Sequence, residues 1–421
     1  MKILHSKLVI TRMSDKYASD SQEEKNPDNI ITALYEDGDL VELNCEKAES
    51  DRILNNIYIG KVKNIVSNIQ AAFIEIADGL MCYYSFEDNK SPIFVNHKNS
   101  QKLAIGDELL VQVSKENVKT KAPVVTSNLS FAGKYMVLTT GNCRIGISGK
   151  IPEEQKKRLK SWVKPYASED YGFIVRTNAK DAQKEQIEKE IEALIRRYND
   201  VKSAGLHRTC FSLIYQAPPA YLTNLRDTYA RNLESIITDD GELYGAMKAY
   251  LELEQKEDAG KLMFYEDSLL PLQKLYSLET RLKEALREQV WLKSGAYLII
   301  QPTEAFVVID VNTGKFTGKK KLQDTFLKIN LEAAKEIAKQ LRLRNLSGII
   351  VVDFIDMERE EDRQSLMESL DECLKKDPVK ATLVGMSRLN LVEITRKKVR
   401  KPLKEQMVVQ CPVCGGRGYL Y

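Results

Sequence analysis

The sequence predicts a multidomain protein of mixed α/β and α+β architecture. A chain of 421 residues is longer than one hydrophobic core normally supports, so two or more domains are expected. Short strand patterns separated by turns fill residues 53–127, which is typical of a small β domain. A strand–helix–strand pattern over residues 305–357 predicts two parallel strands in a separate sheet.

The composition narrows the class of protein. The net charge is only +3, so any affinity for nucleic acid must come from local basic patches. The chain contains no run of about 18 apolar residues, and no transmembrane segment is expected. Seven cysteines, an odd number spread along the chain, indicate a reducing cytoplasm rather than a disulfide framework. Three histidines far apart in the sequence disfavour catalysis by a histidine acid–base pair.

The first 127 residues are predicted to be mainly strands. Residues 1–52 carry strand patterns on either side of a polar insert at 14–29, whose role the sequence does not indicate. Residues 53–127 show the pattern of five short strands with aromatic and basic residues on one face. This pattern suits an OB-fold, a barrel that binds single-stranded nucleic acid.

The middle of the chain combines strands with charged helices. The run GFIVRT is a predicted strand that ends in Arg176 and Thr177. A guanidinium, a hydroxyl and nearby backbone N–H groups can bind an anion, although such a pair is more often a solvated strand end. Residues 222–285 are acidic and mostly helical in pattern. Asp239 and Asp240 lie in a turn there; a metal site is conceivable, but acids are commonplace in turns.

Two apolar strand patterns in the last third of the chain each carry an aspartate. These are Asp310 and Asp353, with Asp356 close behind the second. Burying a carboxylate in an apolar strand costs on the order of several kcal/mol unless the group is paired or binds a metal. One interpretation is a Mg²⁺ site, which commonly uses one or two carboxylates with waters and substrate phosphate oxygens. The other is a pair of solvated acids at strand ends.

The segment between these two strands predicts a helix. Asp324 is a candidate N-cap and Gly348 follows the last turn. Apolar residues recur at helical spacing, at Phe326, Ile329, Ala333, Ile337 and Leu341. A helical crossover makes neighbouring strands parallel, so that their C-terminal ends share one edge of the sheet. Open α/β sheets place their sites at that edge.

Two sequence blocks resemble those of a known family. The run IDVNTG at 309–314 and the run NLEAAKEIAKQLRLRNLSGIIVVDFIDM at 330–357 are similar to the catalytic blocks of the ribonuclease E/G family of bacterial endoribonucleases. The resemblance continues, more weakly, through most of the chain. It implies that Asp310 and Asp353 are Mg²⁺ ligands and that Asn312 positions the scissile phosphate or the metal's water.

The same resemblance implies an RNA-binding role for the OB-fold. Phe73 and Tyr83 match the positions that stack on bases, and Lys115 and Lys121 match basic residues that face the RNA backbone. The family's Gly-Phe pair is Cys82–Tyr83 here, and tyrosine keeps the π face that stacking needs. The alternative for Phe73 is a core aromatic residue.

Further basic residues are assigned by the resemblance. Arg176 and Thr177 match the pair that grips a 5′-monophosphate in the family's 5′-sensor, but Gly149–Lys150 replaces its paired arginines. Residues 388–404 hold seven basic side chains and one acid, which suits either a solvated helix face or a phosphate contact. Arg388 matches a family arginine near the RNA; the roles of other members are open, namely Lys397, Lys398 and Arg400.

The tail CPVCGGRG resembles the family's zinc-link. Cys411 and Cys414 supply two thiolates of the four that a structural zinc prefers, and no second Cys-x-x-Cys is present in the chain. The resemblance implies that two subunits share one Zn²⁺ and form a homodimer. The alternative is a pair of idle cytosolic thiols.

The resemblance also implies a domain layout. We expect a ribonuclease H-like scaffold in two parts, at residues 1–52 and 222–285. An OB-fold at 53–127 and a 5′-sensor region at 128–221 are inserted between these parts. A DNase I-like catalytic subdomain at 286–405 and a zinc-link tail at 406–421 follow. The expected function is Mg²⁺-dependent cleavage of single-stranded RNA in rRNA maturation and mRNA decay, stimulated by 5′-monophosphate ends. The alternative is a non-catalytic RNA-binding or ribosome-maturation factor.

Overall fold

The structure is a computed structural model in which two compact units are distinguished. It describes residues 5–14, 28–48, 52–89, 91–95, 102–117, 122–228, 233–267, 269–314 and 322–407. Unit 1 comprises the described parts of residues 1–49, 230–249 and 258–421. Unit 2 comprises the described parts of residues 50–229 and 250–257.

The first sheet of unit 1 joins segments that are far apart in the sequence. Its strand order is β16-β15-β1-β2-β3, with β1 antiparallel to β2 and parallel to β15. The strands are β1 (Ser6–Ser14), β2 (Asp28–Glu36), β3 (Asp39–Lys47), β15 (Leu233–Thr238) and β16 (Leu262–Phe264). Residues 222–285 therefore contribute two strands as well as the expected helices, because β15 and β16 extend this sheet.

The second sheet of unit 1 has the order β17-β18-β19-β20-β22-β21. Its strands are β17 (Gln289–Trp291), β18 (Tyr297–Pro302), β19 (Phe306–Asn312), β20 (Gly348–Asp353), β21 (Ala381–Met386) and β22 (Leu391–Arg396). β19 and β20 are parallel and are connected through α7 (Leu322–Leu343). The predicted strand–helix–strand unit is thus confirmed. The stretch 388–404, by contrast, contains the strand β22 rather than one basic helix.

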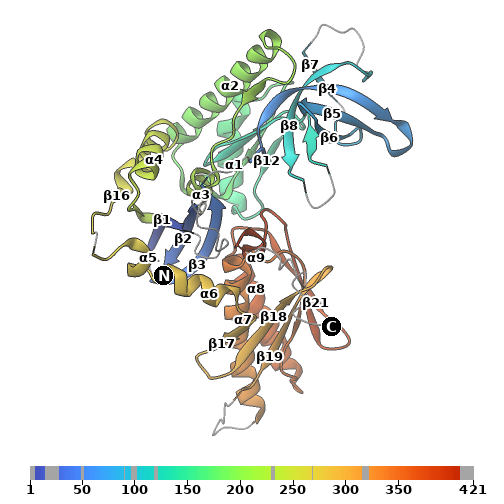
Figure 1. Cartoon of the computed structure of the whole chain (residues 1–421). Helices are drawn as coiled ribbons and strands as arrows, with labels where there is room; N and C mark the ends of the chain where they lie inside the picture. The colour runs from blue at the N-terminus through green and yellow to red at the C-terminus, as the bar shows by residue number, and fades with distance from the viewer. Residues whose placement is uncertain are drawn as a thin grey trace, which may run out of the picture. The chain divides into compact units, whose positions relative to one another are not determined.

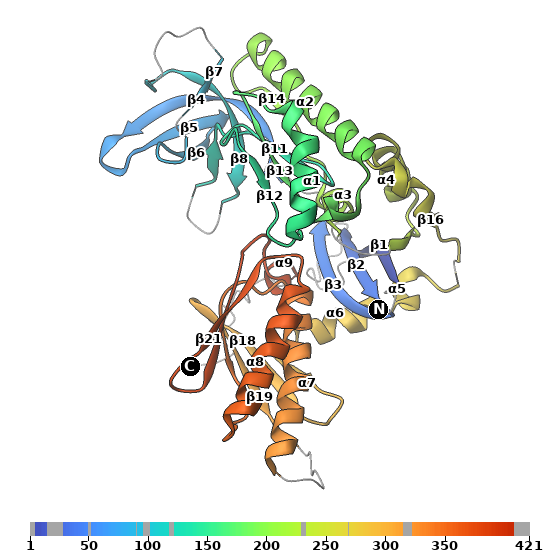
Figure 2. The same cartoon turned by 180° about the vertical axis from the view of Figure 1, so that it is seen from behind.

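Two helices cover one face of this sheet. α7 and α8 (Glu360–Lys375) lie together on that face (Figures 1 and 2). Ile329, Ala333 and Ile337 from α7 share a buried core with Leu366 and Leu370 from α8 and with the inward side chains of the strands. The helical spacing predicted for α7 is therefore the spacing of its core face.

The predicted N-cap of α7 is wrong. α7 begins at Leu322, so Asp324 lies inside its first turn. A carboxylate in that position is favoured by the helix dipole, and Asp324 also accepts a hydrogen bond of 3.0 Å from Arg359 Nη2.

The two catalytic-candidate strands are buried on one face only. Ile309 and Val352 are fully buried against the helices, whereas Asp310 and Asp353 are exposed on the opposite face. Successive residues of a strand point to opposite faces, so each aspartate follows a core residue and faces outward. The two acids are therefore not buried in the apolar core of their strands.

Two arginines, one buried and one half-buried, form ion pairs that connect elements of unit 1. Arg396 on β22 lies in an ion pair with Asp377, with Nε 2.8 Å from Oδ2, and its Nη1 donates to Asn345 Oδ1 and to the carbonyl of Leu346. Arg342 at the end of α7 donates to a carboxylate from each of β2 and β3 of the first sheet, at 3.1 and 2.8 Å, namely Glu36 and Glu42. These contacts connect the second sheet to its helix and to the first sheet.

Unit 2 contains a closed five-stranded barrel. The strands β4, β5, β6, β9 and β8 pair in turn, and β8 returns to β4. Their bounds are Ile57–Val66, Ala71–Ala77, Leu80–Ser85, Val124–Thr126 and Glu108–Lys115. β14 (Leu213–Tyr215) pairs with β4, and β7 (Ile93–Phe94) with β8. Closure follows from the inward apolar side chains of each strand, which form a single core.

A four-stranded sheet completes unit 2. Its order is β10-β11-β13-β12, with the bounds Ser130–Ala132, Met136–Thr139, Gly172–Val175 and Ile145–Ile147. α1 (Glu153–Val163) and α2 (Lys184–His207) pack on it through a shared core. The buried face of α2 continues to Val201 and Gly205, near its C-terminal end.

The remaining described α-helices are α3 (Ala220–Asp227), α4 (Gly241–Glu254), α5 (Leu272–Leu275), α6 (Leu278–Leu286) and α9 (Leu403–Met407). Within the described ranges, every helix is too short or too polar to cross a lipid bilayer. The predicted mixed α/β class and the OB-like barrel of five strands are confirmed.

Candidate active site

Two aspartates lie side by side at one edge of the six-stranded sheet. Asp310 on β19 and Asp353 on β20 are partners in the parallel register of these strands. Since adjacent strands lie about 4.8 Å apart, the two carboxylates are near neighbours on the open face. The fold thus brings together the two acids that the sequence singled out.

The carboxylates repel one another. Burial raises the pKa of Asp353, and the negative charges of Asp310 and Asp356 raise this pKa further. Among the described residues, no three His, Cys, Asp or Glu side chains gather as a metal-ligating group. Mg²⁺ does not need such a group, because it is held by one or two carboxylates and keeps several waters or phosphate oxygens. The exposed pair of aspartates fits this donor set, and a divalent cation would relieve its repulsion.

Asparagines orient this site. Asn312, at the end of β19, donates from Nδ2 to Asp310 Oδ2 at 2.7 Å. Asn330 on α7 is fully buried, donates to the carbonyl of Ile355 at 2.7 Å and accepts from the Ile355 N–H at 3.1 Å. It therefore fixes the loop that follows Asp353. Our sequence analysis missed Asn330; the signal for it was a polar residue beside the apolar stripe of α7.

The loop after Asn312 approaches the turn before β18. Gly314 has a φ of +58°, and a Cβ on it would lie 2.3 Å from the carbonyl oxygen of Gly295. Any larger residue at position 314 would therefore push the two segments apart.

The basic residues of 388–404 do not share one surface. Arg396 is buried in its ion pair, and Arg400 donates to Asn44 Oδ1 at 2.8 Å. The other five basic members of the stretch are exposed, namely Arg388, Lys397, Lys398, Lys401 and Lys404. Arg388 lies in the turn between β21 and β22. Three residues later, β22 begins at Leu391, which is the register partner of Asp353.

An aromatic pair lies on the outer side of the barrel in unit 2. Phe73 on β5 and Tyr83 on β6 are register partners, with ring centroids 6.2 Å apart in an edge-to-face arrangement. Both are half-buried, whereas the next residue, Tyr84, is buried and donates to Ser127 Oγ. Phe73 is therefore not enclosed in the core. Lys115, at the end of β8, is exposed.

Arg176 and Thr177 follow β13 in the four-stranded sheet. Arg176 Nη1 donates to the carbonyl of Gly133 at 2.6 Å and to Asp227 Oδ1 at 2.8 Å. Arg226 donates to both oxygens of Asp227. Burial raises the pKa of Asp227, but the two guanidinium groups outweigh burial and lower it. Thr177 Oγ1 lies 2.9 Å from Ser148 Oγ.

The chain matches the family model described as the ribonuclease E/G family over residues 130–399. It is 36% identical to ribonuclease G of Haemophilus influenzae and 34% identical to ribonuclease G of Escherichia coli K12, in each case over 93% of this chain and 82% of the relative. It is 34% identical to ribonuclease E of Synechocystis over 87% of this chain and 55% of that relative.

The chain belongs to the ribonuclease E/G family. As a member of this family it is an endoribonuclease, a hydrolase that acts on RNA phosphodiester bonds. The resemblance found in the sequence is thereby confirmed.

The remaining residues singled out by the sequence lie either outside the described residues or outside the candidate sites. Lys121, Cys411 and Cys414 lie outside the described residues. Asp239 accepts hydrogen bonds from Thr11 Oγ1 and the Leu272 N–H, and Asp240 is paired with Arg12 and accepts from the Leu243 N–H. These two turn acids thus stabilise the ribonuclease's first sheet and its helices, as the simpler interpretation held.

A carboxylate that the sequence did not reveal anchors the segment around Arg176. Glu190 on α2 accepts the N–H groups of three consecutive residues, Lys134, Tyr135 and Met136, at 2.7–2.9 Å. Gly133, just before them, accepts from Arg176, and a Cβ on it would lie 2.4 Å from Glu190 Cδ. Glu190 therefore holds in place the backbone that Arg176 contacts.

This arrangement makes the stability of unit 2 depend on pH. Burial raises the pKa of Glu190 to about 7, against the opposing effect of its N–H bonds. Because the pKa of Glu190 is higher in the folded protein than in the unfolded chain, protonation of Glu190 stabilises the folded state. This stabilisation is fully present below about pH 4.5 and is lost as the pH rises through 7. Glu190→Gln resembles the protonated carboxyl, so its unfolding free energy should decline less between these pH values, by at most about 3 kcal/mol. Urea unfolding at a series of pH values measures this; exposed Glu185→Gln is the control, and parallel curves for Glu190→Gln and wild type contradict the prediction.

Proposed function

We propose that this endoribonuclease cleaves single-stranded RNA with Mg²⁺ held by Asp310 and Asp353. The observation that carries the proposal is the register of these two acids on neighbouring parallel strands, with their carboxylates exposed at the sheet edge. Bound there, Mg²⁺ supplies Lewis-acid stabilisation of the charge that develops on the phosphoryl oxygens.

The chain's own residues position the RNA. Asn312, oriented by its bond to Asp310, presents its amide to the scissile phosphate or to the attacking water. Arg388, exposed in the β21–β22 turn, neutralises a backbone phosphate. The water oxygen bonds to phosphorus and gives up a proton to solvent, while the P–O3′ bond breaks and O3′ takes up a proton. The products therefore carry a 5′-phosphate and a 3′-hydroxyl.

Loss of either aspartate should greatly slow cleavage while RNA binding is largely kept. Asp310→Asn and Asp353→Asn each remove ligand charge, and loss of one such electrostatic stabiliser costs on the order of a hundredfold or more in rate. The measurement is cleavage of a 5′-monophosphorylated, AU-rich oligonucleotide in excess Mg²⁺. Asp371→Asn, on α8 and outside this site, is the matched control.

Two outcomes of that assay would overturn the assignment. Wild-type rates in either aspartate variant would mean that the acids are not the metal ligands. RNA that is bound but not cut by the wild type would favour a non-catalytic RNA-binding or ribosome-maturation factor instead.

We further propose that the barrel binds the RNA strand. The Phe73–Tyr83 pair offers partly exposed aromatic surface on which bases can stack. Lys115, and by resemblance Lys121, supply positive charge along the backbone path. Because stacking accepts any base, this surface contributes affinity for single strands more than sequence preference.

The proposed 5′-sensor is the pair Arg176 and Thr177. Asp227 and the Gly133 carbonyl hold the Arg176 guanidinium in one orientation, so little entropy is lost when a phosphate binds. Asp227 also offsets part of the positive charge of Arg176, and Arg226 shares this carboxylate. We infer that the site suits one terminal phosphate better than a triphosphate.

The sensor predicts a preference for 5′-monophosphate ends. Wild-type enzyme should cleave 5′-monophosphorylated RNA faster than the same RNA with a 5′-hydroxyl, and Arg176→Ala should erase the difference. Rates on the two substrates give the ratio, and Arg158→Ala, a variant of an exposed arginine on α1, should keep it. Equal wild-type rates would rule the sensor out.

The expected domain layout is retained as a proposal. The order β3-β2-β1-β15-β16 supports a ribonuclease H-like scaffold, and the six-stranded sheet with α7 and α8 supports a DNase I-like catalytic subdomain. The RNA targets we propose are rRNA precursors and mRNA. The described cysteines are free thiols, in keeping with the cytoplasm as the proposed location.

We also propose that Cys411 and Cys414 of two chains share one Zn²⁺ and so form a homodimer. This arrangement requires half a zinc per chain, whereas a site closed within one chain requires one. Metal analysis and light scattering of the wild type and of the double variant Cys411→Ser/Cys414→Ser test it. A metal-free wild-type dimer, or a double variant that still dimerises, would exclude the shared zinc.

A further inference from the structure

Two aromatic side chains, Trp291 and Tyr297, lie beside the candidate active site. Trp291 on β17 and Tyr297 on β18 are register partners, with ring centroids 5.2 Å apart and ring planes tilted by 55°. Tyr297 is in turn the register partner of Asn312 on β19. Because register partners on adjacent strands share a face of the sheet, the two rings and the Asn312 side chain follow one another across it.

The two rings lie on the open face of the six-stranded sheet. Their neighbours along the strands, Val290 and Leu298, point the other way and pack in the core shared with α7 and α8. Asp310, two residues before Asn312, lies on the open face as well, since side chains alternate along a strand. β17 is two strands from β19, so about 10 Å separates Trp291 from the strand that carries Asp310. The aromatic pair therefore belongs to the same surface as the candidate acids.

The exposure of Trp291 indicates a binding surface. Tryptophan is highly buried on average, because its side chain is large and mostly apolar. Here Trp291 is 63% exposed, although it stands on a strand whose other face is packed. An exposed indole next to a second ring offers the flat π surface on which the bases of single-stranded nucleic acid stack.

A protein surface is the competing occupant of this face. Exposed apolar side chains also mark protein contacts, and the open face carries two more of them, Phe306 and Ile349. These two are register partners at the opposite end of β19 and β20, about 13 Å along the strands from the candidate acids. The row of Trp291, by contrast, continues into Asn312, which donates to Asp310. This continuity with the candidate active site favours RNA as the occupant of the aromatic pair.

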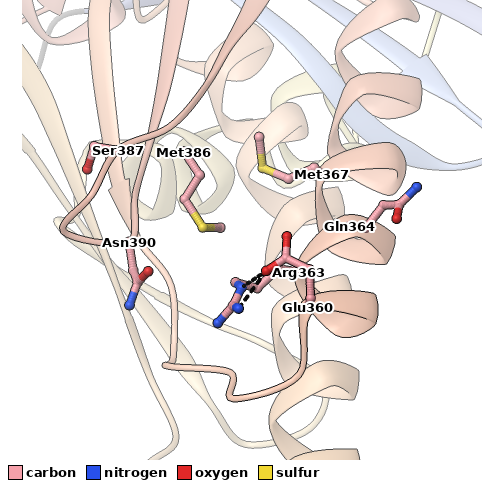
Figure 3. Close-up of a pocket in the computed structure, with 7 residues that line it drawn as sticks. All are labelled: Glu360, Arg363, Gln364, Met367, Met386, Ser387 and Asn390. Carbon is pink, nitrogen blue, oxygen red and sulfur yellow. Dashed lines mark hydrogen bonds and ion pairs between the residues drawn. The ribbon is translucent and has the colours of Figure 1, made fainter.

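A pocket of about 540 Å³ beside α8 does not belong to this surface (Figure 3). Met367 from α8 and Met386 from β21 supply its apolar side chains, and both pack against the core beneath the helices. Its two amides, Gln364 and Asn390, each donate to a carboxylate, at 2.9 and 3.3 Å. The pocket therefore lies outside the surface that the candidate acids face.

We propose that Trp291, backed by Tyr297, is a stacking platform for one base of the RNA strand whose phosphate lies at Asp310 and Asp353. A base stacked on the indole has left the stack of a duplex, so the platform favours single strands at the point of cleavage. It confers no preference among bases, because every base has a π face. The inference rests on the proposed endoribonuclease function and adds a binding site to it.

The chain contains two tryptophans, so one substitution makes Trp291 its own reporter. Trp162, half-buried on α1, is replaced by phenylalanine, which keeps an aromatic ring there. The Trp162→Phe chain is titrated with a 5′-monophosphorylated, AU-rich oligonucleotide of mapped cleavage site, without added divalent cation. The fluorescence of Trp291 should fall in step with binding, which the anisotropy of a 3′-labelled copy measures in parallel. An oligonucleotide with abasic nucleotides around the cleavage site keeps its phosphates and should bind without this loss of fluorescence.

Substitutions then separate stacking from apolar contact. Trp291→Leu keeps an apolar side chain on β17 but removes the π face, so kcat/KM with Mg²⁺ should fall about tenfold, within the usual range for one base stack. Trp291→Phe keeps a ring and should lose less than Trp291→Leu. Phe306→Ala removes an exposed aromatic side chain at the far end of the same face and is the matched control, which should cleave as the wild type does. Circular dichroism of each variant shows that it is folded.

The outcomes separate this inference from the function on which it rests. A wild type that does not cut the RNA overturns the endoribonuclease proposal, and the fluorescence of Trp291 still tests the platform. Bound RNA that leaves this fluorescence unchanged overturns the platform alone. So does a cutting wild type whose kcat/KM is matched by Trp291→Leu, or an equal loss in Trp291→Leu and Phe306→Ala. A lower mass of Trp291→Leu than of the wild type in light scattering would make the ring a protein contact and would likewise overturn the platform.

Discussion

The candidate active site depends on one interaction, the repulsion between Asp310 and Asp353. Register places these carboxylates next to each other on parallel strands, and the pKa of Asp353 is raised first by burial and then by the negative charges of Asp310 and Asp356. Two neighbouring carboxylates of like charge are unfavourable unless the surrounding structure holds them in place. The core beneath them, shared by α7, α8 and the strands, must hold the two acids together against their electrostatic preference to separate.

Buried polar contacts make that arrangement specific. Asn330 fixes the loop after Asp353 from inside α7, and Arg396 connects β22 to Asp377 and to the turn before β20. Such buried groups contribute little net free energy, because their desolvation offsets much of their attraction. Their effect is to allow one relative position of strand, loop and helix. A site that depends on the spacing of two carboxylates needs this restriction.

In unit 2 an attraction between opposite charges, not a repulsion, orients the functional candidate. There the functional candidate is a cation, Arg176, and a carboxylate, Asp227, orients it. Glu190 in turn fixes the backbone segment whose Gly133 carbonyl Arg176 contacts. In unit 2 the side chain proposed to meet RNA is therefore held by a partner, Asp227, to which the proposal assigns no contact with RNA. The net charge at this proposed site is set by Asp227 and Arg226 as much as by Arg176 itself.

The amino-acid sequence by itself determined the β19–α7–β20 unit, the barrel and the candidate acids. These features depend on short-range periodicity and on local matches to a family, which can be read along the chain. It did not reveal that Asp310 and Asp353 face outward, because a run of apolar residues does not show which strand face the helices cover. Nor did it show that Arg396 is buried, or that Glu190 and Asn330 position loops far from them in sequence. Only the tertiary structure decided these points, since each depends on contacts between segments whose distance apart is set by the packing of the whole unit.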